Sequence, residues 1–152
     1  MYDVFISYSV KDQGFADMVH DHLRAQNLEV FLAPISLTVG NHWTPQIMDA
    51  LRSSEWVFLL ASKNALESTN VQHEVGGAIF GKKKLVPITW DLQPNELPRW
   101  IADYQGIVLT DANMKGITEQ VSQLAARVKA SKEKAQLVAA AVFAVGLWVL
   151  SK

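Results

Sequence analysis

Residues 2–12 read YDVFISYSVKD, a short β-rich run that ends in a polar turn. Residues 11–26 then favour a helix, because apolar side chains recur there at helical spacing. Those side chains are Phe15, Met18, Val19 and Leu23, and His22 shares their helical spacing. Asp12 lies where the helix should begin, a position that favours aspartate. A strand followed at once by a helix is the opening of an α/β domain.

The rest of the chain continues this alternation. We expect strands at residues 2–7, 28–32, 55–61, 84–90 and 105–109, and helices at residues 11–26, 43–53, 70–80 and 116–130. Residues 33–42 should form a loop, because Pro34 and Gly40 break regular structure. This pattern predicts one parallel sheet covered by helices on both faces. Its core should include Val4, Ile6, Val30, Val57, Leu59, Val86 and Ile88.

Composition narrows the class of protein. The 152 residues are 49% hydrophobic and 19% charged with net charge −1, which fits one ordinary domain. Without a concentrated positive surface, nucleic acid is not an expected partner. No cysteine is present, so disulfides, thiol nucleophiles and cysteine metal sites are excluded. The first residues contain no basic segment followed by a cleavable apolar stretch, so no secretory signal is expected.

Several familiar chemistries lack their motifs. The turn after the first strand contains neither the dinucleotide-binding glycine spacing nor a phosphate-binding Gly-Lys-Ser/Thr sequence. His73 and Glu74 begin like a zinc-protease helix, but Gly77 stands where the second histidine ligand would be. Lysines 82–84 are interpreted as solvated residues at a helix end. We therefore expect neither a metal ion nor a resident cofactor.

Several short sequence motifs, in a fixed order along the chain, indicate a protein family. The opening strand carries Asp3, Phe5, Ile6, Ser7 and Tyr8, and the later loop places Gly40 three residues before Trp43. Further on come a glutamate-bearing helix and the string KKKLVPI. With these features the chain resembles a TIR (Toll/interleukin-1 receptor) domain, especially the bacterial kind, over residues 2–130. The resemblance implies a flavodoxin-like three-layer sandwich with strand order 2-1-3-4-5.

The resemblance also implies a reaction. Many bacterial TIR domains cleave NAD⁺ with a glutamate on the helix after the third strand, and Glu74 matches that residue. We expect NAD⁺ as substrate, with Glu74 as catalytic residue and Tyr8, Ser9, Gly40 and Trp43 lining the substrate pocket. The expected function is an NAD⁺ glycohydrolase or cyclase in bacterial antiphage signalling. Asn70 and Ala33 replace the usual tryptophan and aspartate, and the sequence leaves the product open.

A non-catalytic alternative remains. Ile35, Leu37 and Val39 are apolar residues in the expected loop, a composition that suits a protein partner. Under this interpretation the domain is a membrane-tethered module that signals by association of TIR domains without turnover.

The C-terminal tail differs from the rest. Residues 137–150 contain no polar side chain and follow the Lys-rich segment KASKEKAQ. We expect a TIR domain at residues 1–130, a basic juxtamembrane linker at 131–134 and a transmembrane helix at 135–151. Basic residues before the apolar stretch would place the domain on the cytoplasmic face of a membrane, a bacterial inner membrane, as a single-pass protein.

Overall fold

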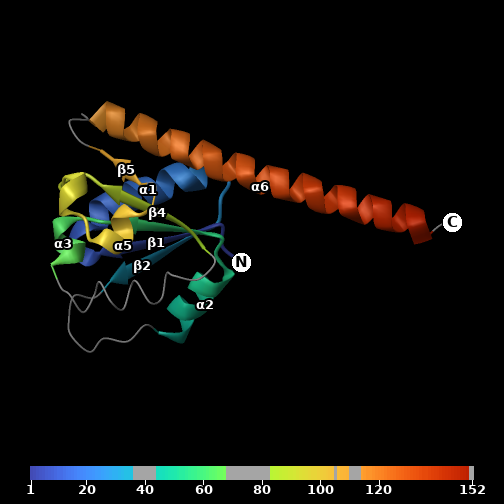
Figure 1. The fold of residues 1–152 in the computed structure, drawn as a ribbon, viewed down its shortest axis with the longest axis horizontal. Helices are drawn as coiled ribbons and strands as arrows, with labels where there is room; N and C mark the ends of the chain where they lie inside the picture. Colours follow the sequence, from blue (N-terminus) through green and yellow to red (C-terminus); the bar gives the residue numbers. More distant parts are fainter. Residues whose placement is uncertain (36–43, 68–82, 105, 110–113, 151–152) are drawn as a thin grey trace.

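A computed structural model describes residues 1–35, 44–67, 83–104, 106–109 and 114–150. Five parallel strands form one sheet in the order β2-β1-β3-β4-β5 (Figure 1). They are β1 (Val4–Ser9), β2 (Val30–Ile35), β3 (Trp56–Leu60), β4 (Lys84–Thr89) and β5 (Ile107–Val108). The five expected strands and their order are confirmed, and their bounds differ from the expected ones by at most three residues.

Helices cover both faces of this sheet. They are α1 (Gln13–Ala25), α2 (Pro45–Ser53), α3 (Lys63–Leu66), α5 (Arg99–Ala102) and α6 (Met114–Leu150), with 3₁₀ turns η1 (Val10–Asp12) and η2 (Pro94–Glu96). The helix expected at residues 70–80 lies outside the described residues. The first helix is confirmed, preceded by η1.

Alternate residues of β1 serve two separate cores. Val4, Ile6 and Tyr8 face the core under α1 and α6, whereas Phe5 faces the core that contains Ile101 of α5. All six residues of β1 are buried. A strand buried on both faces explains why the opening run lacks polar alternation. The seven predicted core residues are all buried, so that prediction is confirmed.

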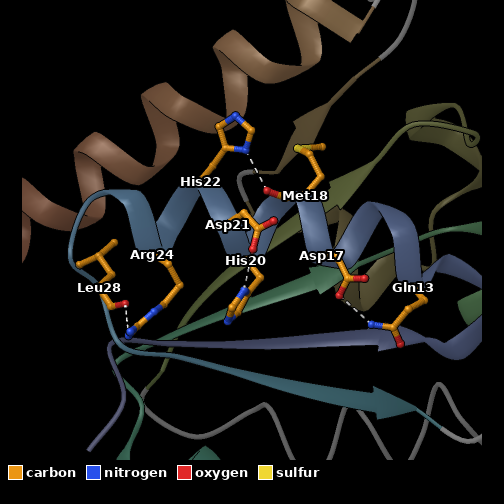
Figure 2. A network of polar contacts seen from close by, with 8 residues as sticks. All are labelled: Gln13, Asp17, Met18, His20, Asp21, His22, Arg24 and Leu28. Atoms are coloured by element: carbon orange, nitrogen blue, oxygen red, sulfur yellow. Dashed lines mark hydrogen bonds and ion pairs between the residues drawn. The ribbon is translucent and has the colours of Figure 1, made fainter.

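Short-range polar contacts lie along α1 (Figure 2). Gln13 Nε2 donates to Asp17 Oδ1 at 2.8 Å, and His22 Nδ1 donates to the Met18 carbonyl at 2.8 Å. The helix ends at Ala25. Two residues further on, Asn27 has a φ of 60°, a left-handed conformation that asparagine tolerates better than most residues. This turn sends the chain directly into β2.

Strand β2 extends further than the sequence predicted. We expected a loop from Ala33, but Ala33, Pro34 and Ile35 continue the strand opposite Ser7, Tyr8 and Ser9 of β1. Proline lacks the N–H that a central strand would need, and β2 lies at the sheet edge, where proline is tolerated. The expected loop position of Ile35 was therefore wrong, because this residue is the last of β2.

Helix α6 continues unbroken from the domain into the tail. Residues 131–134, expected as a linker, are helical. Lys132 Nζ contacts Asp3 Oδ2 at 3.0 Å, and Lys84 Nζ donates to Ser131 Oγ at 3.2 Å, which fastens the helix to the sheet's N-terminal edge. Beyond these contacts residues 133–142 are exposed, and the helix projects away from the domain (Figure 1).

The expected single-pass membrane localisation was wrong. Among the described residues, no helix combines the length and the apolar character needed to cross a membrane. The uninterrupted apolar stretch, residues 137–150, would rise only about 21 Å at 1.5 Å per residue, against about 30 Å of hydrocarbon. Lys132, Glu133 and Lys134 prevent the span from extending toward the domain.

Gly106 allows β5 to approach β4 closely, and this predicts a stability effect. A Cβ at residue 106 would lie 2.7 Å from the Pro87 carbonyl oxygen, so Gly106→Ala should destabilise the fold by about 1–3 kcal/mol in urea denaturation. Gly14, in α1, has open space around its missing Cβ. Gly14→Ala should therefore stabilise the helix by about 0.5–1 kcal/mol. Equal effects of the two changes would contradict the close approach at Gly106.

Candidate functional site

The carboxyl ends of β1, β3 and β4 bring three loops to one edge of the sheet. In open parallel sheets, ligands bind outside this edge. The described residues there belong to η1 and the start of α1, to α3, and to the segment after β4 (Figure 1). Two residues of the expected substrate pocket, Tyr8 and Ser9, end β1 at this edge.

Tyr8 is held by the core and by the start of α1. Only 3% of the residue is exposed, and its hydroxyl donates to Gln13 Oε1 at 2.9 Å. Burial raises the pKa of the Tyr8 hydroxyl above 10.0, the Gln13 hydrogen bond opposes that shift, and the charge of Asp17 adds to it. The hydroxyl therefore stays neutral at physiological pH. It can orient a neighbour but not act as a base.

Ser9 has a structural role in this edge. The side chain is fully buried, and its Oγ accepts a hydrogen bond from the Lys11 backbone N–H at 3.3 Å. Ser9 thereby caps η1, because an extended residue with a short side-chain oxygen can satisfy a free N–H at a helix start. This contact fixes the direction in which the chain leaves β1.

Asp12 joins two of the three loops. Its carboxylate accepts from Ser62 Oγ at 2.5 Å and from Asn64 Nδ2 at 3.0 Å. Ser62 Oγ in turn accepts from the Ala65 N–H at 3.0 Å and so caps α3. A charged acceptor shortens and strengthens such bonds. The loops after β1 and β3 are thus held in one arrangement.

The segment after β4 is tied to the same edge. The Asp91 carboxylate accepts from the Lys63 backbone N–H at 3.1 and 3.2 Å. Trp90 stacks on Phe15 of α1, with ring centroids 4.0 Å apart and planes 18° apart. Sequence reasoning missed both links. The only signal for the link at Asp91 was that Ser62 and Asp91, both polar, directly follow two of the expected strands, at ends that a parallel sheet brings together.

The other expected site residues have a mixed placement. Glu74, Gly40, Trp43, Leu37 and Val39 lie outside the described residues, as does Asn70. Ala33 is buried within β2. In the chain, Glu74 falls between α3 and β4. The polypeptide that carries it leaves the described structure after α3, close to the Asp12 and Asp91 contacts, and re-enters it at the start of β4, at the opposite edge of the sheet. In the part of the chain that the structure describes, no three metal-ligating side chains gather.

Comparisons with known proteins agree with this arrangement. The TIR domain family matches residues 4–125. A protein of Brachypodium distachyon named "probable 2′ cyclic ADP-D-ribose synthase" is 26% identical over 106 residues, which cover 67% of this chain and 47% of that protein. The chain therefore spans about half the length of this curated relative.

Solved structures show the same fold. The TIR domains of the activated Roq1 resistosome superpose with a TM-score of 0.65 at 19% identity, covering 81% of this chain and 98% of that one. The TIR domain of the Toll-related receptor TRR-2 from Hydra magnipapillata gives a TM-score of 0.62 at 18% identity, covering 85% and 99%.

The chain is an α/β domain of the flavodoxin-like kind, with β1 buried at the centre of its sheet. Its candidate site lies at the carboxyl edge of that sheet, where three loops are joined. The family match covers most of the chain and includes all five strands. The chain belongs to the TIR domain family.

The Asp12 contacts predict a large loss of stability on Asp12→Ala. The change leaves the fully buried Ser62 hydroxyl and the Asn64 amide without their acceptor, which should cost about 1–3 kcal/mol. Asp17 is a matched control, because it is an exposed aspartate whose carboxylate accepts a side-chain hydrogen bond from Gln13 within α1. Asp17→Ala should change stability by only about 0.5 kcal/mol. Similar urea midpoints for both variants would contradict the role of Asp12.

The raised pKa of Tyr8 predicts an alkaline effect on stability. Since the folded state holds this proton to higher pH than the unfolded chain, the contribution is complete below about pH 10 and is lost as pH rises through the raised pKa. Tyr8→Phe should cost about 0.5–1.5 kcal/mol at pH 7 through the lost Gln13 bond. As the pH rises above about 10, the difference in stability between wild type and variant should narrow. A constant difference across that range would contradict the assignment.

Proposed function

We propose that this TIR domain cleaves NAD⁺ at the bond between nicotinamide and ribose, with Glu74 as the central carboxylate. The observation that carries the proposal is family membership, since the family match spans residues 4–125. In addition, a relative 26% identical over 106 residues is named a probable 2′ cyclic ADP-D-ribose synthase. NAD⁺ is the substrate, and the chain's own residues supply the chemistry.

This reaction needs few catalytic groups from the protein. In NAD⁺ the nicotinamide ring is a cationic pyridinium, and it leaves the ribose as a neutral base. No general acid therefore has to protonate this leaving group, whereas the leaving group of an ordinary glycoside needs one. The electron pair of the broken C–N bond stays with nicotinamide, and positive charge develops on the ribose. A carboxylate at residue 74 would oppose that charge and accept hydrogen bonds from ribose hydroxyls. Such electrostatic stabilisation is commonly the largest single contribution to an enzyme's rate.

The residues described at the carboxyl edge of the sheet fit a supporting role, in which they position the loop that leads to Glu74. Asp12 and Asp91 already accept hydrogen bonds from Ser62, Asn64 and Lys63, so they hold the loop after β3 rather than present free charge. The chain enters residues 68–82 from this fixed loop. Tyr8, Gly40 and Trp43 would complete the pocket, with Trp43 offering a face for adenine.

The product depends on the group that traps the ribose. Water at the anomeric carbon gives ADP-ribose, whereas a nucleophile of the same nucleotide closes a ring and gives a cyclic form. In both cases one C–N bond breaks and one bond forms to the same carbon. The name of the Brachypodium relative describes a cyclic product for that protein. Separation of the products from this chain would identify the trapping group.

Glu74→Gln tests the proposal with the full-length chain incubated with NAD⁺ at high protein concentration. Loss of one such charge should lower the rate of nicotinamide release by about 10²–10³. Glu67→Gln is a matched control, because Glu67 is an exposed glutamate at the end of α3 in the same connection. It should retain the wild-type rate, and both variants should melt near the wild-type temperature.

Two results would contradict parts of the proposal. If assembled wild-type protein releases no nicotinamide, the enzymatic function fails. The second candidate then takes its place: a TIR association module without turnover, which the likeness to the TIR domains of a resistosome favours. If wild type is active and Glu74→Gln is equally active, the reaction stands but its central residue is misassigned.

A further inference from the structure

A pocket lies between α6 and the part of β4 that is not paired with β5. Strand β5 has only two residues, and its pairing with β4 begins at Ile107, opposite Ile88. Residues 84–87 of β4 therefore have no β5 residue paired with them. Side chains and backbone from β3, β4, α6 and the start of β5 enclose a cavity of about 520 Å³ there: Trp56, Leu85, Val86, Gly106, Ile107, Leu124 and Arg127.

The walls of this pocket are mainly apolar. Val86 and Leu124 belong to the core under α1 and α6, and Trp56 and Ile107 pack against that core while remaining partly exposed. Small-molecule sites are typically apolar clefts of about 300–1,000 Å³, and this cavity lies in that range. Partly exposed apolar side chains gain free energy when a ligand removes them from water. The pocket therefore suits a molecule with an apolar body.

Arg127 is the charged residue among those that line the pocket. It lies on α6 one turn after Leu124 and one turn before Ser131, whose hydroxyl accepts from Lys84 Nζ at 3.2 Å. Residues three and four apart share one side of a helix, so Arg127 lies on the side of α6 that faces β4. It is exposed, and in the part of the chain that the structure describes its guanidinium has no hydrogen-bond or ion-pair partner.

The nearest other cation is already neutralised. Lys84 Nζ lies 2.9 Å from Glu55 Oε1 and 4.9 Å from the centre of the Trp56 ring. The charge of Arg127 is the one beside the apolar walls that a ligand can pair. A guanidinium holds its donors in a planar fork that matches the two oxygens of a carboxylate. It also balances a single negative charge, whereas a phosphate monoester carries nearly two.

We propose that this pocket binds an organic acid whose apolar body lies against Trp56, Ile107 and Leu124 and whose carboxylate pairs with Arg127. An apolar cavity of about 150 Å³ accepts one benzene ring, so this cavity has room for a body of two rings. The inference does not depend on NAD⁺ cleavage, since none of the expected catalytic or substrate residues lines the pocket.

Methyl NMR of the full-length chain, titrated with 4-biphenylacetate and with its uncharged amide, tests the proposal. The two probes share their rings and differ in charge. The acid should shift the methyl signals of Val86, Ile107 and Leu124 but not that of Ile101, which does not line this pocket. It should bind about tenfold more tightly than the amide, as expected for one charge-assisted pair. Added salt should weaken binding of the acid more than binding of the amide.

Arg127→Gln keeps a long polar side chain and removes the charge. Affinity for the acid should fall about tenfold, while affinity for the amide stays the same. Because Arg127 is exposed, the change should leave the fold intact. Lys129→Gln is the matched control, since Lys129 is a basic residue of α6 that does not line the pocket and has no partner among the described residues. It should leave both affinities unchanged.

Four results would overturn the proposal. Unmoved lining signals at saturating acid would mean that the pocket holds no organic acid. Equal affinities of wild type for acid and amide would mean that the pocket does not select a carboxylate. Unchanged affinity for the acid in Arg127→Gln would exclude the guanidinium as its partner, and an equal loss in Lys129→Gln would assign the effect to the general charge of α6. Should Arg127→Gln fail to fold, the comparison of acid with amide in wild type decides by itself.

Discussion

Burial of β1 on both faces is the constraint on which the other elements depend. Its six residues are enclosed between β2 and β3 within the sheet and between two helical layers across it. A strand in that position needs helices over each face, because one open face would expose Val4, Ile6 and Tyr8 and the other would expose Phe5. Phe5 and Ile6, adjacent in the chain, therefore belong to different cores and draw different helices onto the sheet.

The same constraint places the candidate site. Helices α1 and α3 start just past the carboxyl ends of β1 and β3, so the polar residues that begin them meet at one edge. Asp12 is half-buried there, and its carboxylate accepts hydrogen bonds from Ser62 and Asn64 of the neighbouring loop. A charge removed from water needs such donors, which is why the loops are joined to each other and not merely close. A site formed beside these joined loops would therefore have one side held in a fixed arrangement.

The local sequence was enough to predict the strands, the helices and a covered parallel sheet, because strand and helix periodicities are properties of short segments. The strand order was predicted from the family resemblance. Val4, Ile6, Val86 and Ile88 could be assigned to the core from the apolar runs alone. The extension of β2 through Pro34 could not, since a proline reads as a breaker unless the strand is known to lie at an edge. The Asp12 link to Ser62 joins residues 50 positions apart, and only the sheet order brings them together. Glu74 stays a prediction from resemblance.

The 37 residues of α6 give the tail a defined angular relation to the sheet. Since the helix is fastened near Ser131 and Lys132 and then runs on exposed, each position along it points in a direction set by the domain's own orientation. One inserted residue between 133 and 142 would turn everything after it by about 100° about the helix axis, whereas seven would nearly restore the original direction. The number of residues in the tail therefore fixes the direction in which its far residues face relative to the domain, as well as their distance from it.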